Sequence, residues 1–204
     1  MQITIDKKTG IFLGVIAVLV TVIIALLGLQ RHSRDFPDMD HGSMHHDASS
    51  HLQMVGSDVM FLQMMIPHHQ QAINISRLAI DRSQDAEVVT LAKAIRNGQT
   101  AELAQMRSWL TDAHEQLTLP HSMGDGAGGM LSQADLTKLQ SLSGKDFDVF
   151  WLTKMIAHHE GALHMVTMIQ DSPDSNMRRF GGEIDSVQSG QIDQMTTILK
   201  RLGA

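Results

Sequence analysis

Apolar side chains recur at spacings of three and four residues in four separate stretches of this chain. The stretches begin at Asp58, at residue 85, at Asp148 and at residue 174. Such spacing places the apolar side chains on one face of an α-helix. Polar breaks near Ser83 and Pro173 divide the four stretches into two hairpins. The pattern therefore predicts an all-α fold, an antiparallel four-helix bundle of the ferritin-like kind, over residues 55–204.

The two hairpins are copies of one another. The sixteen residues from Asp58 and the sixteen from Asp148, at an offset of 90, share eight identities. A second block matches at an offset of 89, where Ile95, Gln99, Gln105, Met106 and Leu110 fall on Ile184, Gln188, Gln194, Met195 and Leu199. Two blocks that match in the same order indicate a duplication. We expect hairpins at 55–117 and 145–204, joined by a Gly-rich crossover at 118–144 that contains a short helix near 133–141.

A continuous apolar run precedes the bundle. Residues 11–29 contain no charged side chain, and as a helix they would span about 28 Å, close to the hydrocarbon core of a bilayer. We interpret this run as a single transmembrane anchor after a short tail, residues 1–10. A cleaved signal peptide is the alternative, although no convincing cleavage signal follows Leu29. A short amino-terminal tail most simply stays inside, so we expect the rest of the chain on the extracytoplasmic, periplasmic side of the membrane.

The composition adds a chemical hint. The chain has 15 Met and 12 His but no Cys, and its net charge is −6. Thiolate metal sites are therefore excluded, and the acidic balance argues against nucleic acid as a partner. Residues 30–54 have no apolar period and form a predicted flexible linker, which carries the donors Met39, His41, Met44, His45 and His46. Thioether sulfur selects Cu(I), so these residues are candidate copper ligands; a merely polar spacer is the alternative.

Each hairpin also carries a candidate metal site on its first helix. Met65 precedes His68 and His69 by three and four residues, and in the second copy Met155 stands in the same relation to His158 and His159. These spacings bring side chains together on a helix surface. The second copy adds Glu160, His164 and Met168 at further spacings of four, and its Met168 and His164 join the candidate ligands.

We expect the two Met-x-x-His-His blocks to lie at the same level of the bundle. In an up-down-up-down bundle the first and third helices run parallel, so the blocks would be diagonally opposed across the core. Pro67 replaces Ala157 of the second copy and predicts either a kink or a helix end beside His68. The alternative for all four histidines is a purely structural role in the core.

The motif MI-x-HH in both copies, GGMLS before the second copy and the run FD-x-FWLTKMIAHHEGALHM resemble the domain-of-unknown-function family 305. The resemblance covers roughly residues 55 to 202. It implies a ferritin-like helical bundle and a copper-linked role, as in the extracytoplasmic copper-binding proteins of the CopM type.

We therefore expect a membrane-anchored, extracytoplasmic copper-binding protein that sequesters, detoxifies or delivers Cu(I), with Cu(II) or Ag(I) as further ions. A copper-accepting oxidase or another membrane complex is a candidate partner. The alternatives are a structural accessory subunit of a membrane (respiratory) complex and a di-metal oxidoreductase. An enzyme is disfavoured, because di-metal sites take carboxylates from all four helices, whereas here Gln191 matches Glu102 and no carboxylate pair exists.

Overall fold

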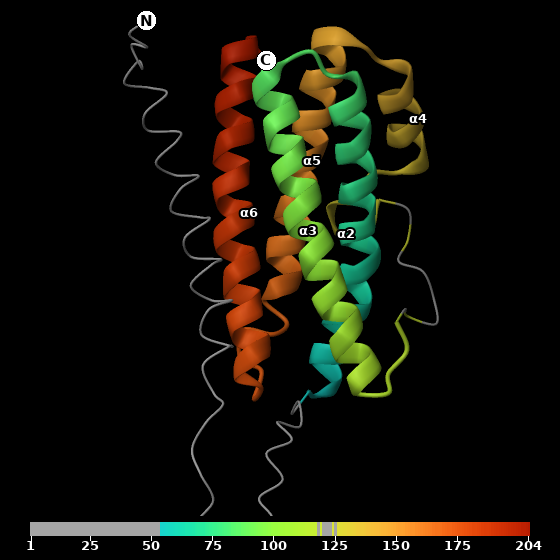
Figure 1. The fold of residues 1–204 in the computed structure, drawn as a ribbon, viewed down its shortest axis with the longest axis vertical. Helices are drawn as coiled ribbons and strands as arrows, with labels where there is room; N and C mark the ends of the chain where they lie inside the picture. Colours follow the sequence, from blue (N-terminus) through green and yellow to red (C-terminus); the bar gives the residue numbers. More distant parts are fainter. Residues whose placement is uncertain (1–53, 118, 120–123, 125) are drawn as a thin grey trace, which may run out of the picture. The chain divides into compact units, whose positions relative to one another are not determined.

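The computed structural model describes residues 54–204, apart from 118, 120–123 and 125, and every regular element in this part of the chain is helical. The elements are α2 (Gly56–Arg82), α3 (Ala86–Asp112), the short 3₁₀ helix η1 (Ala127–Gly129), α4 (Gln133–Ser141), α5 (Gly144–Val166) and α6 (Ser175–Leu202). Four of these helices are long and lie side by side as a bundle (Figure 1). The predicted helices, both breaks and the short helix at 133–141 are confirmed.

Local sequence signals explain where the second helix of each hairpin begins. The Asp85 carboxylate accepts hydrogen bonds from the backbone N–H groups of Glu87 and Val88 at the start of α3. Asp174 caps α6 in the same way, through the N–H of Asn176. Such caps satisfy amide donors that have no partner inside the helix.

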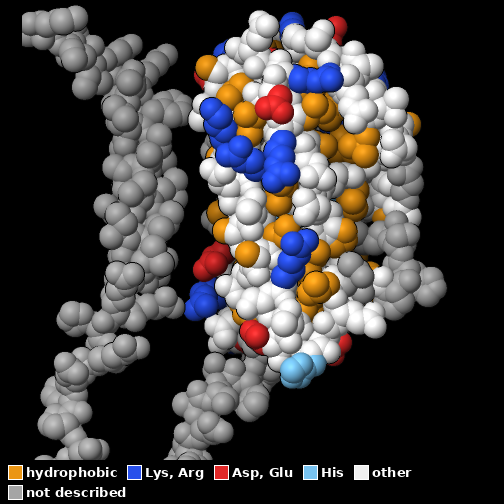
Figure 2. Space-filling view, turned by 45° about the vertical axis from the view of Figure 1, so that its right-hand side comes forward, with side chains coloured by type: hydrophobic (Ala, Val, Ile, Leu, Met, Phe, Trp, Pro, Cys, Tyr) orange, Lys and Arg blue, Asp and Glu red, His pale blue; other side chains and the backbone are white. Residues whose placement is uncertain are grey.

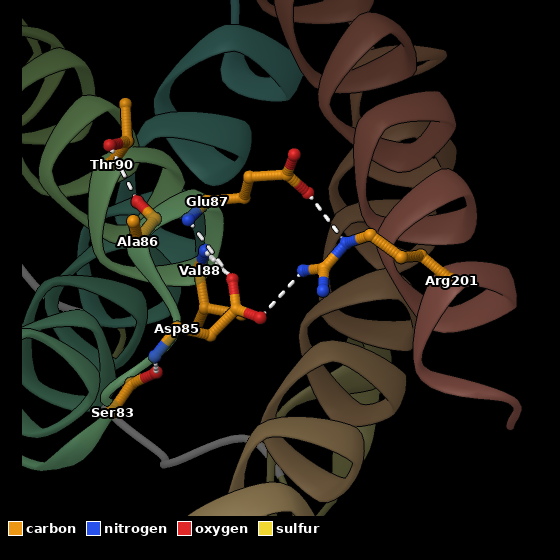
Figure 3. A network of polar contacts seen from close by, with 7 residues as sticks. All are labelled: Ser83, Asp85, Ala86, Glu87, Val88, Thr90 and Arg201. Carbon is orange, nitrogen blue, oxygen red and sulfur yellow. Dashed lines mark hydrogen bonds and ion pairs between the residues drawn. The ribbon is translucent and has the colours of Figure 1, made fainter.

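The end of α6 is tied to the start of α3 by a surface network (Figure 3). Arg201 donates hydrogen bonds to Asp85 at 2.6 Å and to Glu87 at 2.9 Å. Although partial burial raises it, the pKa of Asp85 is held below its usual value by the hydrogen bonds that the carboxylate accepts from Arg201 and from the Val88 and Glu87 amides. The bonds to Asp85 and Glu87 raise the pKa of Arg201, because they favour its charged form.

The first and third long helices, α2 and α5, are neighbours that run in opposite directions. Ser172 Oγ donates to Asp58 at one end of the pair, and Trp151 Nε1 donates to the Ile75 carbonyl near the other. Our prediction of parallel, diagonally opposed helices is therefore wrong. The described part of the crossover shows the cause: η1 lies beside His68 at mid-bundle and the end of α4 lies at Arg82, so α5 begins at the end where α2 finishes (Figure 1).

The core consists of two clusters, one toward each end of the bundle. The cluster at the α2 start holds Phe61, Leu62, Phe180 and Ile184. It also holds seven methionines, buried or packed against it: Met54, Met64, Met65, Met106, Met165, Met168 and Met177. The cluster at the other end contains Phe147, Trp151 and Leu152 but only two methionines, Met155 and Met195. The thioether content of the core is thus concentrated at one end.

Two further predictions meet the structure here. Helix α2 continues through Pro67, so the alternative that one helix ends at this proline is wrong. The predicted anchor at 11–29 and the linker lie outside the described residues. Within the described part, none of the helices combines the length and apolarity required to cross a bilayer.

The bundle surface is mixed in character (Figure 2). On the face shown, Lys and Arg side chains are spread along the bundle, and hydrophobic side chains reach the surface between them. The large hydrophobic side chains that are most exposed are Val55, Met60, Leu117 and Val187.

Candidate metal centre

The four histidines of the two MI-x-HH motifs meet at the middle of the bundle. The rings of His68 and His158 stack with their centroids 3.6 Å apart, and His69 and His159 flank this pair on the same two helices. All four side chains are completely buried. Because α2 and α5 are antiparallel and both motifs lie at mid-helix, a near two-fold axis passes between His68 and His158. The histidines of the two blocks share one level, as predicted, but the methionines do not, because the antiparallel helices place Met65 and Met155 in opposite core clusters.

Three of these imidazoles are held through Nε2. Nε2 of His69 lies 2.6 Å from the Glu102 carboxylate, and Nε2 of His159 lies 2.7 Å from Gln191 Oε1. Nε2 of His68 lies 2.9 Å from the Gly128 carbonyl oxygen. Since these oxygen atoms accept hydrogen bonds, Nε2 carries the proton in each ring and Nδ1 keeps its lone pair.

The remaining ring nitrogens have no hydrogen-bond partner. Nδ1 of all four histidines is buried without a partner, and so is Nε2 of His158. Buried polar groups are nearly always paired, and an imidazole that donates one N–H to an oxygen while its other nitrogen is free has the arrangement of a metal-ligating histidine.

Three of the four histidines have lowered pKa values. Burial and the neighbouring histidines lower the pKa of His68 to about 3. Burial, together with His69, lowers the pKa of His159 to about 4. Burial and the other three histidines hold the pKa of His158 well below its usual value. Metal ions bind the neutral imidazole, so these groups need lose no proton to act as ligands.

The glycines of the crossover allow its backbone to reach the layer. A Cβ atom added to Gly161 would lie 1.8 Å from the Gly128 carbonyl oxygen, and one added to Gly129 would lie 2.2 Å from the Ala157 carbonyl oxygen. Gly128 and Gly129 also have positive φ angles, of 62° and 77°. Close backbone contact at these glycines directs the Gly128 carbonyl to His68.

Two buried amides lie on the second helices of the hairpins. Gln99 and Gln188 are almost completely buried, and neither end of either side-chain amide has a hydrogen-bond partner. Gln99 is one turn before Glu102, and Gln188 is one turn before Gln191. In the sequence, both glutamines stand out only because they recur at matching positions of the two copies. This repetition was the signal that could have singled them out.

The predicted ligands divide into three groups. Met65 and Met155 are buried one turn from the histidines. His164, like Glu160, is exposed on α5, and Met168 is half-buried at the Met-rich end of the core, so neither His164 nor Met168 joins the histidine layer. The linker residues Met39, His41, Met44, His45 and His46 lie outside the described residues.

A family model described as "Domain of unknown function (DUF305)" matches residues 58–201. The chain belongs to the DUF305 family. No curated protein sequence matches the chain.

Several solved DUF305 structures share this fold. A DUF305 protein from Streptomyces coelicolor is 31% identical, with a TM-score of 0.68 over 72% of this chain and 94% of that one. A DUF305 fragment from Deinococcus radiodurans is 30% identical, with the same TM-score, over 72% of this chain and 97% of the fragment. CopM in its Cu(II)-bound form is 26% identical, with a TM-score of 0.63, over 71% of this chain and 96% of CopM. CopM has also been solved in Cu(I)-bound and Ag-bound forms.

In this DUF305 bundle, the described residues contain no group of three or more His, Asp or Glu side chains placed to hold a metal ion. The thioethers of Met65 and Met155 are the remaining donors next to the layer, and they favour a soft ion.

Proposed function

We propose that this DUF305 protein is a membrane-anchored, extracytoplasmic copper-binding protein that takes up Cu(I) as cargo, for sequestration or delivery to a membrane partner. The observation that carries the proposal is the set of buried Nδ1 atoms. At His68, His69 and His159, a fixed oxygen holds the opposite nitrogen of the same ring.

Cu(I) fits these residues better than other common ions. It accepts few ligands, combines imidazole with thioether, and has no need of carboxylate. Neutral imidazoles beside Met65 and Met155 offer this donor set, and Ag(I) shares it. The structures of CopM with copper and silver support the choice of ion. The linker methionines and histidines would supply further ligands outside the bundle.

We infer that the protein is not an enzyme. Di-metal oxidoreductases of ferritin-like bundles use carboxylates from several helices, and among the described residues Glu102 is the one carboxylate bonded to a histidine of the layer. The amide of Gln191 occupies the place of its matching carboxylate.

The test is a Cu(I) competition titration of the full chain against a chromophoric chelator. We expect a variant with His68→Ala and His158→Ala to bind fewer copper ions than the wild type while keeping its helical circular dichroism. The matched control is His164→Ala, which removes an exposed imidazole from α5 and should leave bundle binding unchanged.

A second arm separates the bundle from the linker. Deletion of residues 35–51 should remove the copper bound by the linker and keep that of the histidine layer. If the His68 and His158 variant binds copper as the wild type does in this shortened background, the histidines are structural and the proposal is wrong.

A further inference from the structure

We use the word groove for the seam between α2 and α5 that runs from the Asp58–Ser172 hydrogen bond to the paired rings of His68 and His158. Because the two helices are antiparallel, the positions of α2 between 58 and 68 lie opposite positions 158–172, which comprise the last part of α5 and the turn after it. Met60 and Met64 fall in the first interval, and Met165 and Met168 fall in the second.

Helical spacing places Met60, Met64 and Met165 along the groove, and Met168 packs against the same core cluster as Met64 and Met165. On α2, Met60, Met64 and His68 follow one another at intervals of four, so they form one row, and His68 marks the side of α2 that faces α5. On α5, His158, Gly161 and Met165 follow at intervals of three and four, so they form the facing row, and Met168 lies in the turn directly after α5.

The end of the groove that Met165 occupies lies next to the histidine layer. A Cβ atom added to Gly128 would lie 3.9 Å from the sulfur of Met165. The carbonyl oxygen of this same Gly128 accepts the hydrogen bond from His68. The Met165 thioether is therefore adjacent to the loop atom that holds the histidine.

Exposure falls along the groove toward the layer. Met60 is 44% exposed, Met64 and Met168 are half-buried, and Met165 is 3% exposed. An exposed methionine is common in itself, but Met60 extends the thioethers of this seam from the buried Met165 to the solvent.

The duplicated hairpin provides an internal comparison. At the offset of 90, the positions of Met60, Met64, Met165 and Met168 correspond to Phe150, Lys154, Ile75 and Leu78. This related groove contains no sulfur. It is tied to α4, since Lys154 bonds Asp135 and the Lys138 ammonium lies 4.7 Å from the centre of the Phe150 ring. The bundle scaffold thus does not demand methionine at these four positions.

We propose that Met60, Met64, Met165 and Met168 form a thioether site for a soft monovalent ion, Cu(I) or Ag(I), and that this site passes the ion to the histidine layer. Thioethers bind such ions without proton release, and the transfer is a ligand exchange from sulfur to imidazole nitrogen with no change of oxidation state. The binding of a soft ion by the four sulfurs stands alone, whereas the transfer step rests on the proposed function.

Silver(I) is the probe for the site, because it is a soft monovalent ion that is not oxidised in air. The full chain, with its methionine methyl groups labelled with ¹³C, is titrated with Ag(I) and followed by NMR. We expect the methyl resonances of these four methionines to shift, while those of Met177 and Met195 in the core stay in place.

The variant Met60→Leu with Met64→Leu keeps the side-chain volume and removes two sulfurs. It should bind Ag(I) about tenfold or more weakly at the groove, whereas Met195→Leu, the matched control, should bind as the wild type does. Unchanged Met165 and Met168 shifts in this variant, or shifts confined to methionines outside the groove, would show that the four residues are packing residues only.

The histidine variant separates the two proposals. In the protein with His68→Ala and His158→Ala, the groove should still bind Ag(I), even if copper binding by the layer is lost. In the Met60 and Met64 variant, Cu(I) should reach the histidines more slowly with unchanged final affinity. Equal loading rates in this variant and the wild type would overturn the transfer step but not the function of the layer.

Discussion

The two hairpins of the bundle place the same histidines at the same level but support them with different chemistry. His69 of the first copy is bonded to a carboxylate, Glu102, while His159 of the second is bonded to an amide, Gln191. The crossover adds a second difference. Gln71 exchanges two hydrogen bonds with the backbone of Leu131, whereas Gly161, its match in the second copy, has no side chain and lets the loop approach. A duplicated scaffold has thus kept its central residues and changed the groups around them.

Acidification should have the largest effect on the free energy of unfolding. It tests whether burying a neutral histidine costs the same free energy in both copies. The pKa values of His68, about 3, and His159, about 4, lie below the usual value near 6.5. The unfolded chain therefore takes up protons that the folded chain excludes. Stability is complete above pH 6.5 and is lost as the pH falls toward 4, by on the order of 1.4 kcal/mol per unit for each such histidine.

This loss can be measured by urea unfolding of metal-free protein between pH 7 and pH 4. The variants His68→Gln and His159→Gln should each show a shallower dependence on pH than the wild type. His164→Gln, the exposed control, should not. A wild-type stability that is flat over this range would contradict the burial of neutral imidazoles.

Substitution of Gly161, on the first helix of the second copy, should have the next largest effect on stability. Gly161→Ala forces a methyl group against the Gly128 carbonyl oxygen, so we expect the free energy of unfolding to fall by about 2 kcal/mol or more. Gly190→Ala is the control, because nothing lies within 4 Å of its added Cβ and alanine is the better helix former. Equal stability of the two variants in urea unfolding would mean that the loop does not pack on α5 as described.

Exchanging the side chains that bond His69 and His159 should test directly how the two copies differ in metal affinity. A carboxylate partner makes an imidazole a stronger ligand, so Glu102→Gln should weaken Cu(I) binding by about tenfold. Gln191→Glu should strengthen it, because His159 then gains the partner that His69 has. Chelator competition measures both affinities, and circular dichroism verifies the fold. If Glu102→Gln weakens binding and Gln191→Glu leaves it unchanged, His159 contributes no ligand.

The ion pairs at the end of the bundle should give the smallest effect. Arg201 bridges Asp85 and Glu87, whereas the first copy has Asp112 at the matching position. Arg201→Gln should lower the melting temperature slightly, and the difference should vanish in about 1 M salt, where exposed charges are screened. Arg179→Gln, which breaks a longer pair with Glu183, is the control and should change less. A difference that persists in high salt would assign Arg201 a packing role instead.

The sequence predicted which segments form helices but not how the helices are connected in space. Periodicity predicted the long helices, the helix at 133–141 and the meeting of the two His pairs. It could not predict the direction of α5, because the apolar stripe of a helix is the same in either direction, and the Gly-rich crossover was long enough for both. The partners of His69 and His159 lie 33 and 32 residues away along the chain, so no local pattern joins them. The regular spacing of Met and His residues on α5 also made His164 a candidate ligand, although its side chain is exposed.

The near two-fold arrangement has a consequence for the origin of the bundle. One hairpin paired with a second copy of itself about the same axis would already bring four histidines together, as symmetric dimers do with self-complementary surfaces. In such a dimer every residue is present twice, so a carboxylate at position 102 would recur at position 191. Fusion of the two copies into one chain removes this constraint. Glutamate at position 102 and glutamine at the matching position 191 are a difference that only the fused chain can carry.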